Sequence, residues 1–428
     1  MDATLAAPLR FAFVANENRV IALVSSPSDL GGWRPLIERD IYFETGNNPA
    51  TSLDLRDQAR LKPSPTALRN GFGARSETGS NILIDRVRAG YFGEAGVRDP
   101  HVVQYADGTP YIKNNKLYFT LTNAGLGFFE KAHWGVWTMN LSDYTNVEQV
   151  GNIFWRNEDD PVVPPTKVLG HHAGQIVRDE GTGRWIVLAS SWGDFGPQGG
   201  DGALTPGTVT PNPARPPVDI VYTELPLEKD ILRGVHVLSG RKHPVNAVPF
   251  PTEGKWDPGL TRIDGVWYLA YVIATDLFTD FQPALAKSTI DHDTGLTFVG
   301  ADWEKVATEG PIIQKLGGEW RLFASCGDDE PAQFEGRYPI YFLESANPQA
   351  AAANRRLAFD GYLNAPHPTN IPHPMIVPIR YRRDGRTYTK YIMITFNGDQ
   401  YYIERLGYGT HGDFYVMQAE QTVRGYEF

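Results

Sequence analysis

The feature that most constrains the fold is a pattern that occurs five times: a short apolar strand, a tight turn, and a second strand rich in aromatic residues. The first strands of these segments are Asp99–Tyr105, His172–Val177, Asp257–Ile263, Glu309–Lys315 and His373–Ile379. The turns include the dipeptides Asp107-Gly108, Asp264-Gly265, Gly317-Gly318 and Asp384-Gly385, which are typical of β-hairpins. The pattern therefore predicts five hairpins that share one shape.

A single hairpin of this kind cannot bury both of its faces, so repeated units must pack against one another. Helical periodicity is nearly absent, and the best helix candidate is the short stretch Asn347–Leu357. We therefore predict an all-β fold, a five-bladed β-propeller in which each hairpin supplies the two innermost strands of a blade. The polar residues that open the first strands would then converge at one end of the central channel: Asp99, His172, Asp257, Glu309 and His373.

No linker in the sequence is strong enough to divide the chain, so we predict a single domain over residues 1–428. Residues 99–397 would form the core blades, and residues 1–98 and 398–428 would close the ring by pairing the strands of Phe11–Val24 with those of Tyr401–Met417. Two polar segments, Glu44–Asn81 and Gly196–Pro217, are rich in turn-forming residues and read as loops.

Composition and charge exclude several classes of partner. The net charge is −10 and no run of Lys or Arg is present, which argues against nucleic acid. No apolar run reaches the roughly 20 residues that span a bilayer, so no membrane partner is expected. The one cysteine, Cys326, cannot form an intrachain disulfide. Met1–Arg10 lacks the pattern of a signal peptide, which leaves open a cytoplasmic protein or one secreted with its signal removed. The oligomeric state also stays open.

The chain is rich in aromatic residues, which make up 12% of it and include 10 Trp. Their flat rings suit stacking on sugars, although packing between blades would use them equally well. Trp134, Trp137, Trp192 and Trp256 are candidates for either role. Trp192 and Trp256 lie next to predicted channel residues, so we expect these two at the rim of a site.

The converging residues include three carboxylates, Asp99, Asp257 and Glu309. Glycoside hydrolysis needs one protonated carboxyl group as general acid and a second carboxylate as base or nucleophile. A third carboxylate can raise the pKa of the acid, because like charges resist joint ionisation. The number and type of these residues therefore favour hydrolysis of glycosidic bonds.

The same segments resemble family 43 glycoside hydrolases, which are five-bladed propellers related to families 32, 62, 68 and 117. The resemblance is carried by Asp99-Pro, by Asp257-Pro and above all by the segment from Glu309 to Ser325, EGPIIQKLGGEWRLFAS, and it covers roughly residues 99–397. It implies that Asp99 is the general base, Asp257 the modulator of the pKa of the acid, and Glu309 the general acid. It also implies a channel histidine at His373, which could bind a metal through water. The opening of the second blade, His171-His172-Ala-Gly-Gln, departs from the family pattern and leaves the subfamily undefined.

These observations predict an enzyme that acts on an oligo- or polysaccharide. Furanoside linkages of the arabinofuranosidase or arabinanase type, cleaved with inversion, are the first expectation. Retaining hydrolases or transglycosylases active on fructan or D-arabinan, and a non-catalytic carbohydrate-binding propeller, are the alternatives. We expect His172, Trp192, Trp256 and His373 to contact substrate. No cofactor is required in this interpretation, although a structural calcium could occupy the central channel.

Overall fold

The computed structural model describes residues 9–16, 19–26, 34–40, 84–87, 96–124, 132–158, 166–194, 218–245, 252–345, 355–398 and 412–419. The predicted loops Glu44–Asn81 and Gly196–Pro217 lie outside these residues, as does all but the end of the helix candidate Asn347–Leu357. The regular secondary structure of the described residues is β-strand, apart from one short 3-10 helix, η2 (Trp192–Asp194). The all-β prediction is therefore confirmed. No described helix is long and apolar enough to cross a membrane.

The chain divides into two compact units, Met1–Ala95 and Gly96–Phe428. In the first unit, a three-stranded antiparallel sheet is formed by β1 (Arg10–Asn16), β2 (Arg19–Ser25) and β3 (Arg34–Asp40). We predicted that the strands of Phe11–Val24 pair with those of Tyr401–Met417 to close the ring. Strands β1 and β2 pair with each other, and β24 (Phe414–Gln418) pairs with a strand of the second unit. Most of Tyr401–Met417 lies outside the described residues, so the closing of the ring by these segments stays a prediction.

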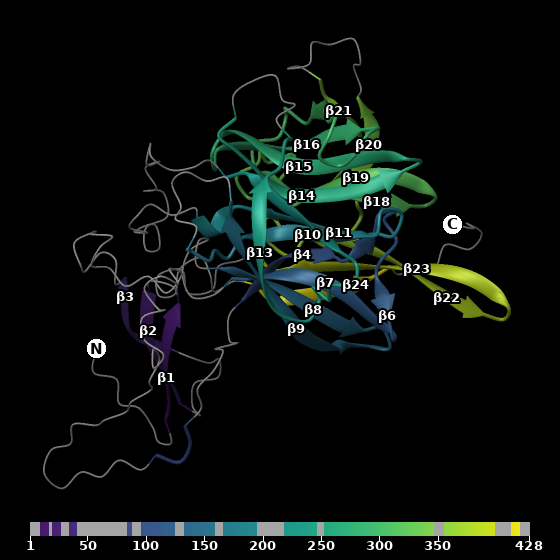
Figure 1. Ribbon diagram of the computed structural model, residues 1–428. Helices are drawn as coiled ribbons and strands as arrows, with labels where there is room; N and C mark the ends of the chain where they lie inside the picture. Colours follow the sequence, from purple (N-terminus) through teal and green to yellow (C-terminus); the bar gives the residue numbers. More distant parts are fainter. Residues whose placement is uncertain are drawn as a thin grey trace, which may run out of the picture. The chain divides into compact units, whose positions relative to one another are not determined.

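The second unit consists of successive antiparallel meanders, coloured blue to yellow in Figure 1. The first meander is β4 (Val97–Val102), β7 (Lys116–Asn123), β8 (His133–Asn140) and β9 (Asp143–Asn157), and the short strand β6 (Ile112–Lys113) pairs with β7. The short strand β5 (Gln104–Tyr105) pairs in parallel with the first strand of the second meander. The second is β10 (His172–Asp179), β11 (Arg184–Ser190), β12 (Ile220–Pro226) and β13 (Gly234–Lys242). Parallel pairing between β9 and β13 joins these two meanders in one sheet.

Three further meanders complete the unit. The third is β14 (Gly254–Ile263), β15 (Val266–Asp276), β16 (Asp280–Ser288) and β17 (Thr297–Ala301). The fourth is β18 (Thr308–Leu316), β19 (Glu319–Cys326), β20 (Pro339–Ser345) and β21 (Leu357–Tyr362). The last is β22 (Met375–Arg383), β23 (Arg386–Phe396) and β24.

The first strands of the meanders form a ring. Strand β4 contacts β10, β10 contacts β14, β14 contacts β18, β18 contacts β22, and β22 contacts β4 again. This closed order of innermost strands is that of a β-propeller. The number of blades stays a prediction, because the first two meanders share a single sheet.

The predicted turns form for a local reason. Both central residues have positive φ at Asp264-Gly265, with φ 49° and 85°, and at Asp384-Gly385, with φ 52° and 76°. A two-residue turn with positive φ at both positions matches the twist of the strands on either side, and Asp and Gly tolerate that conformation. These residues therefore set the registers of β14 with β15 and of β22 with β23.

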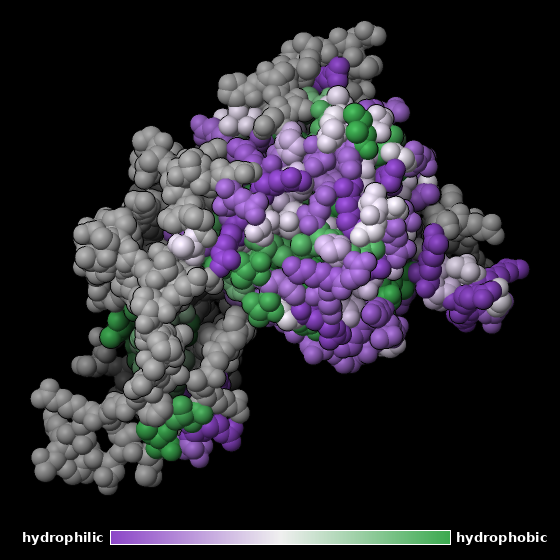
Figure 2. Space-filling view, in the orientation of Figure 1, coloured by the Kyte–Doolittle hydropathy of each residue, from purple (hydrophilic) through white to green (hydrophobic). Residues whose placement is uncertain are grey.

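The interior of the ring combines apolar packing between meanders with a few buried polar bridges. One apolar cluster, for example, joins Phe119 of β7 to Phe323 of β19 and Ile394 of β23. At the channel, the Gln104 side chain donates to the carbonyl of Leu260 and accepts from Gln314. Because buried amides need partners, these bridges hold the first strands in one relative position. The face of the molecule in Figure 2 is mostly hydrophilic, with smaller hydrophobic patches between.

Candidate active site

Four of the first strands share a backbone irregularity where they begin. A register shift interrupts the pairing of β4, β10, β14 and β18, and each shift contains a residue with positive φ: Asp99 (50°), Ala173 (50°), Asp257 (51°) and Gly310 (60°). Such β-bulges bend a strand and redirect its side chains. The bulges therefore bend the beginnings of these strands and direct their side chains toward the channel.

The bulges correct the alignment of repeats that we derived from sequence. Asp99 and Asp257 occupy the positive-φ position itself, whereas His172 and Glu309 each precede it by one residue. We expected the polar residues that open the first strands to occupy equivalent positions. In the second and fourth meanders this alignment is wrong by one residue. The physical reason is that Ala173 and Gly310, not the polar residues before them, adopt the left-handed conformation.

The structure nevertheless brings the three predicted carboxylates together around His373. The Nε2 atom of His373 lies 3.6 Å from Asp99 Oδ1, 3.4 Å from Asp257 Oδ2 and 3.9 Å from Glu309 Oε2. These residues come from three different first strands and from the segment just before β22. The predicted convergence of Asp99, Asp257, Glu309 and His373 is found.

The carboxylates differ in access to solvent. The side chain of Glu309 is 15% exposed, compared with 3% for Asp99 and 6% for Asp257. A small cavity beside them is lined by Asp99, Asp257 and His373 together with His101. A group that must exchange a proton with a bound molecule needs such access, and Glu309 has the most of the three.

The pKa values of the two aspartates are displaced in opposite directions. Burial by itself would raise the pKa of Asp99, but Arg98, His373 and His172 outweigh it and lower that pKa to about 2. Burial raises the pKa of Asp257 to about 8, against the effect of His373 and with the help of Glu309 and Asp99. The site therefore contains one carboxylate that stays ionised and one carboxyl group that retains a proton at neutral pH.

His373 supplies the positive charge at the centre of the site. Burial would lower the pKa of its imidazole, but Asp257, Glu309 and Asp99 raise it above the ordinary value. Ligand atoms of Asp257, Glu309 and His373 lie within 4.8 Å of one another, so this group could also hold a metal ion. The channel calcium stays a prediction.

The two adjacent histidines of the second meander have different partners. His171 accepts a hydrogen bond from the backbone of Gly193 and donates to Asn157 Oδ1 at 2.8 Å. His172 donates from Nδ1 to the carbonyl of Gly170 and is close enough to Asp99 to lower the pKa of that carboxyl. His172 is therefore the member of the pair that belongs to the channel, as expected for adjacent residues on a strand.

The four candidate tryptophans are mostly internal. Trp134 is buried against Trp155, and Trp137 packs at the edge of the cluster that contains Phe119. Trp256 is 1% exposed and packs near Trp192, with ring centroids 5.4 Å apart. The Nε1–H group of Trp256 donates to Glu309 Oε1 at 3.0 Å. Trp256 is thus buried and donates a hydrogen bond to Glu309, although we expected it at the rim of the site.

Several supporting residues escaped the sequence reasoning. Ser190 on β11 donates to the carbonyl of Ala173 and accepts from the backbone N–H of Asp257, so it ties two bulges together. The backbone N–H of Gly310 donates to Asp257 Oδ2 at 3.1 Å. These contacts join neighbouring meanders at the site. No local sequence signal marks them, because their partners are far apart in the chain.

The acidic run Asp328–Glu330 has a structural role that we did not predict. Glu330 is buried, and its Oε1 atom accepts hydrogen bonds from the backbone N–H groups of Val306 and Ala307 and from the Thr308 hydroxyl. Charge-assisted bonds of this kind are stronger than neutral ones. Glu330 therefore holds the start of β18, one residue before Glu309.

Comparisons with known proteins add a structural context. No protein-family model and no curated protein sequence matches this chain. Among solved structures, an α-L-arabinofuranosidase from Lactobacillus brevis is 10% identical, with a TM-score of 0.45 over 78% of this chain and 96% of its own. A family 32 β-fructofuranosidase from Bombyx mori is 13% identical, with a TM-score of 0.38 over 76% of this chain. A sucrose-6-phosphate hydrolase from Lactobacillus gasseri is 12% identical, with a TM-score of 0.43 over 76% of this chain.

This chain spans only 62% and 59% of the length of the last two proteins. All three are glycoside hydrolases, the class that the sequence motifs resemble. The identities and TM-scores are low, so the functional argument rests on the residues of the site itself.

Proposed function

We propose that this protein is a glycoside hydrolase that cleaves furanoside-type linkages of the arabinofuranosidase or arabinanase type. Asp99 acts as general base, Glu309 as general acid, and Asp257 as the group that controls the proton of the acid. The observation that carries the proposal is the meeting of three carboxylates within 4 Å of one histidine nitrogen, with the pKa values of two of them displaced in opposite directions. Strongly displaced pKa values of this kind cluster at functional sites.

The surroundings of each residue support the role proposed for it. Asp99 stays ionised because Arg98 and His373 stabilise its charge, and a base or nucleophile must be ionised. Glu309 has the greatest access to solvent and receives a hydrogen bond from Trp256 that fixes the carboxyl group. Asp257 is buried and bound to the Gly310 N–H, which suits a group that modulates its neighbours.

The stereochemical course is proposed as inverting. Asp99 Oδ1 and Glu309 Oε2 are each within 4 Å of the same nitrogen, so they are less than about 8 Å apart. Inverting enzymes have carboxyl groups about 6.5–9.5 Å apart and retaining ones about 5–5.5 Å apart. A separation below about 8 Å is compatible with both mechanisms. Proton NMR would distinguish them, because it shows the anomeric configuration of the first product formed.

The first test is activity on a panel of aryl furanosides and of arabinan, xylan and fructan polymers. We expect release of sugar from one class, and we expect the Asp99→Asn variant to lose at least about a hundredfold in rate because an amide cannot accept the proton of water. The exposed substitution Asp107→Asn serves as a control and should leave the rate unchanged. If nothing is cleaved while oligosaccharides still bind, the protein is a carbohydrate-binding propeller. Net transfer to sugar acceptors would indicate a transglycosylase.

Trp256 gives a second prediction. Replacing Trp256 with Phe removes the hydrogen bond to Glu309 but keeps an aromatic ring in the cluster with Trp192. We expect kcat to fall by about tenfold, with a shift in the limb of the pH–rate profile that reports the acid and little change in KM. Trp134→Phe, which changes a buried indole elsewhere, should leave that profile as it is. A fall in rate with an unaltered profile would show that Trp256 only supports packing.

A further inference from the structure

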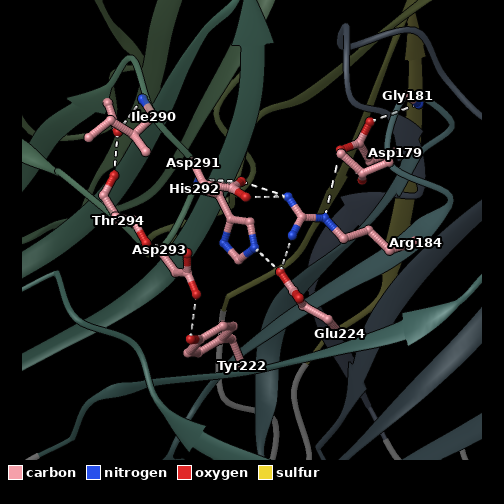
Figure 3. Close-up of polar contacts among 12 residues, drawn as sticks. Asp179, Gly181, Arg184, Tyr222, Glu224, Ile290, Asp291, His292, Asp293 and Thr294 are labelled. Atoms are coloured by element: carbon pink, nitrogen blue, oxygen red, sulfur yellow. Dashed lines mark hydrogen bonds and ion pairs between the residues drawn. The ribbon is translucent and has the colours of Figure 1, made fainter.

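Contacts of two kinds join the second and third meanders, one kind at each end of the strands. At the end away from the carboxylates, Arg184 of β11 donates to Glu224 of β12 at 2.7 Å and to Asp291 of the turn after β16 at 2.6 Å (Figure 3). The buried His292 follows Asp291 in that turn, and its Nε2 atom is 2.6 Å from the same oxygen of Glu224. The group around His292 is therefore a polar brace whose charged members are already paired.

At the end that carries the carboxylates, the same two meanders meet in an apolar cluster. Its buried members include Trp192 of η2 and Trp256 of β14, with ring centroids 5.4 Å apart. Two partly buried side chains pack against this cluster: Phe278 from the turn after β15 and Ile371 from the segment before β22. The Phe278 ring is stacked beside Trp192, with centroids 6.2 Å apart and 15° between the ring planes. Trp256 links the cluster to the site through its hydrogen bond to Glu309.

Phe278 and Ile371 share an unusual backbone conformation. The angle φ is 72° at Phe278 and 49° at Ile371, which places both in the left-handed region. Every other described non-glycine residue with positive φ is Asp, Asn or Ala. Asp and Asn enter this region because their short polar side chains bond locally, whereas a bulky or β-branched residue there is an outlier. Each position therefore holds a large apolar side chain at a cost in backbone strain.

Neither backbone conformation requires a large side chain. The backbone N–H of Thr279 donates to the carbonyl of Asp276 at 3.3 Å, so Phe278 is the third residue of a four-residue turn. Glycine or asparagine is the usual residue where that position has positive φ. Ile371 precedes Pro372, and a residue before proline favours an extended conformation. Strain of this kind is concentrated at functional sites, so it is the two side chains, not the turns, that need an explanation.

The side chain of Ile371 lies beside the start of β18. A methyl group on Gly327 would come within 2.8 Å of Ile371 Cγ1, so the side chain lies directly on the backbone that follows β19. The residue before Gly327 pairs with Thr308, and Glu309 is the next residue of β18. In the ring of first strands, β18 lies between β14 and β22. Phe278 therefore comes from the meander before Glu309, and Ile371 from the segment that leads into the meander after it.

We propose that Phe278 and Ile371 determine specificity by forming apolar walls of the subsite that binds the leaving-group sugar. This inference rests on the proposed hydrolysis with Glu309 as general acid. The acid protonates the leaving oxygen, so the sugar that carries this oxygen lies on the Glu309 side of the scissile bond. The C–H face of a sugar ring suits contact with aromatic and branched aliphatic side chains. Trp192 and Trp256 are only 6% and 1% exposed, whereas Phe278 and Ile371 are more accessible.

The test compares two substrates that differ only in the leaving group: arabinotriose and arabinofuranosyl fluoride, or the same pair built on the sugar that the substrate panel identifies. We expect Phe278→Ala and Ile371→Ala each to raise KM for the trisaccharide about five- to tenfold. The change should be smaller than about twofold for the fluoride, which has no sugar to contact the walls. Phe278→Tyr keeps an aromatic ring and should retain the wild-type KM. Phe359→Ala, which removes an exposed ring on β21, is the control and should change neither value.

A second comparison separates contact with the sugar from support of the fold. Phe278→Gly removes the same ring as Phe278→Ala but fits positive φ, so it should have the higher Tm of the two and the same raised KM. If Tm falls in these variants while KM for the trisaccharide stays at the wild-type value, Phe278 only packs against Trp192 and the inference is wrong, although the hydrolysis stands. If the wild type cleaves no glycoside, the proposed function fails and this inference fails with it.

Discussion

Replacing Glu309 with Gln is expected to lower the rate of polysaccharide hydrolysis by about 10²–10⁴-fold, the usual worth of a positioned general acid. An amide has nearly the shape of the carboxyl group and can keep the hydrogen bond from Trp256, but it has no acidic proton to give to the leaving oxygen. The fold should persist, because Glu309 is the least buried of the three carboxylates.

If Glu309 is the general acid, the loss of rate in Glu309→Gln must also depend on the leaving group of the substrate. A sugar alcohol is a poor leaving group and needs protonation, whereas an activated phenol leaves without it. The loss in Glu309→Gln should therefore be large on a polymer and at most about tenfold on an aryl glycoside with an acidic phenol. Glu319→Gln, an exposed change on the second strand of the same hairpin, is the control and should behave as wild type. Equal losses on both substrates would contradict the acid role of Glu309.

Asp257→Asn is expected to abolish activity and to make the folded protein more stable than wild type at alkaline pH. The pKa of Asp257 is about 8 in the folded protein, compared with about 3.9 in an unfolded chain. The folded state therefore holds a proton that the unfolded state loses. The stability that this proton contributes is complete below pH 4 or so and is lost as the pH rises toward and through about 8. Asn copies the protonated form and has no proton to lose.

The stability of wild type relative to Asp257→Asn should thus fall by an amount on the order of 5 kcal/mol between pH 4 and pH 9, since the pKa differs by about four units between the two states and each unit is worth about 1.4 kcal/mol. Urea titrations at several pH values would measure it. Asp384→Asn is the matched control, because Asp384 is exposed and has φ of 52°, compared with 51° for Asp257. If the stability of both variants relative to wild type had the same pH dependence, Asp257 would not be the protonated group.

The turns and the carboxylates could be predicted from the sequence because their signals are local. Asp264-Gly265 and Asp384-Gly385 set positive φ at two consecutive residues, which few other dipeptides tolerate. Asp99 and Asp257 each precede a proline and occupy the bulge of a first strand. Once five hairpins of one shape are recognised, closure into a ring brings such residues together whatever their separation in the chain.

Other parts of the site could not be predicted, because they depend on contacts between meanders. The hydrogen bond from the backbone N–H of Asp257 to Ser190 joins the third meander to the second. The hydrogen bond from Trp256 to Glu309 joins the third meander to the fourth. The one-residue offset of Glu309 from the bulge depends on which residue adopts positive φ, and Gly310 competes for that position more easily than Glu. The group around His292 likewise needs two meanders to be complete.

By itself, the sequence determined the strands, their tight turns and the identity of the three carboxylates, because short-range sterics and chemical type decide those features. Only the tertiary structure decided which carboxyl group keeps its proton, which is ionised and which meets solvent. Burial and the approach of Arg98 and His373 decide these states, and such quantities exist only after distant strands have packed together.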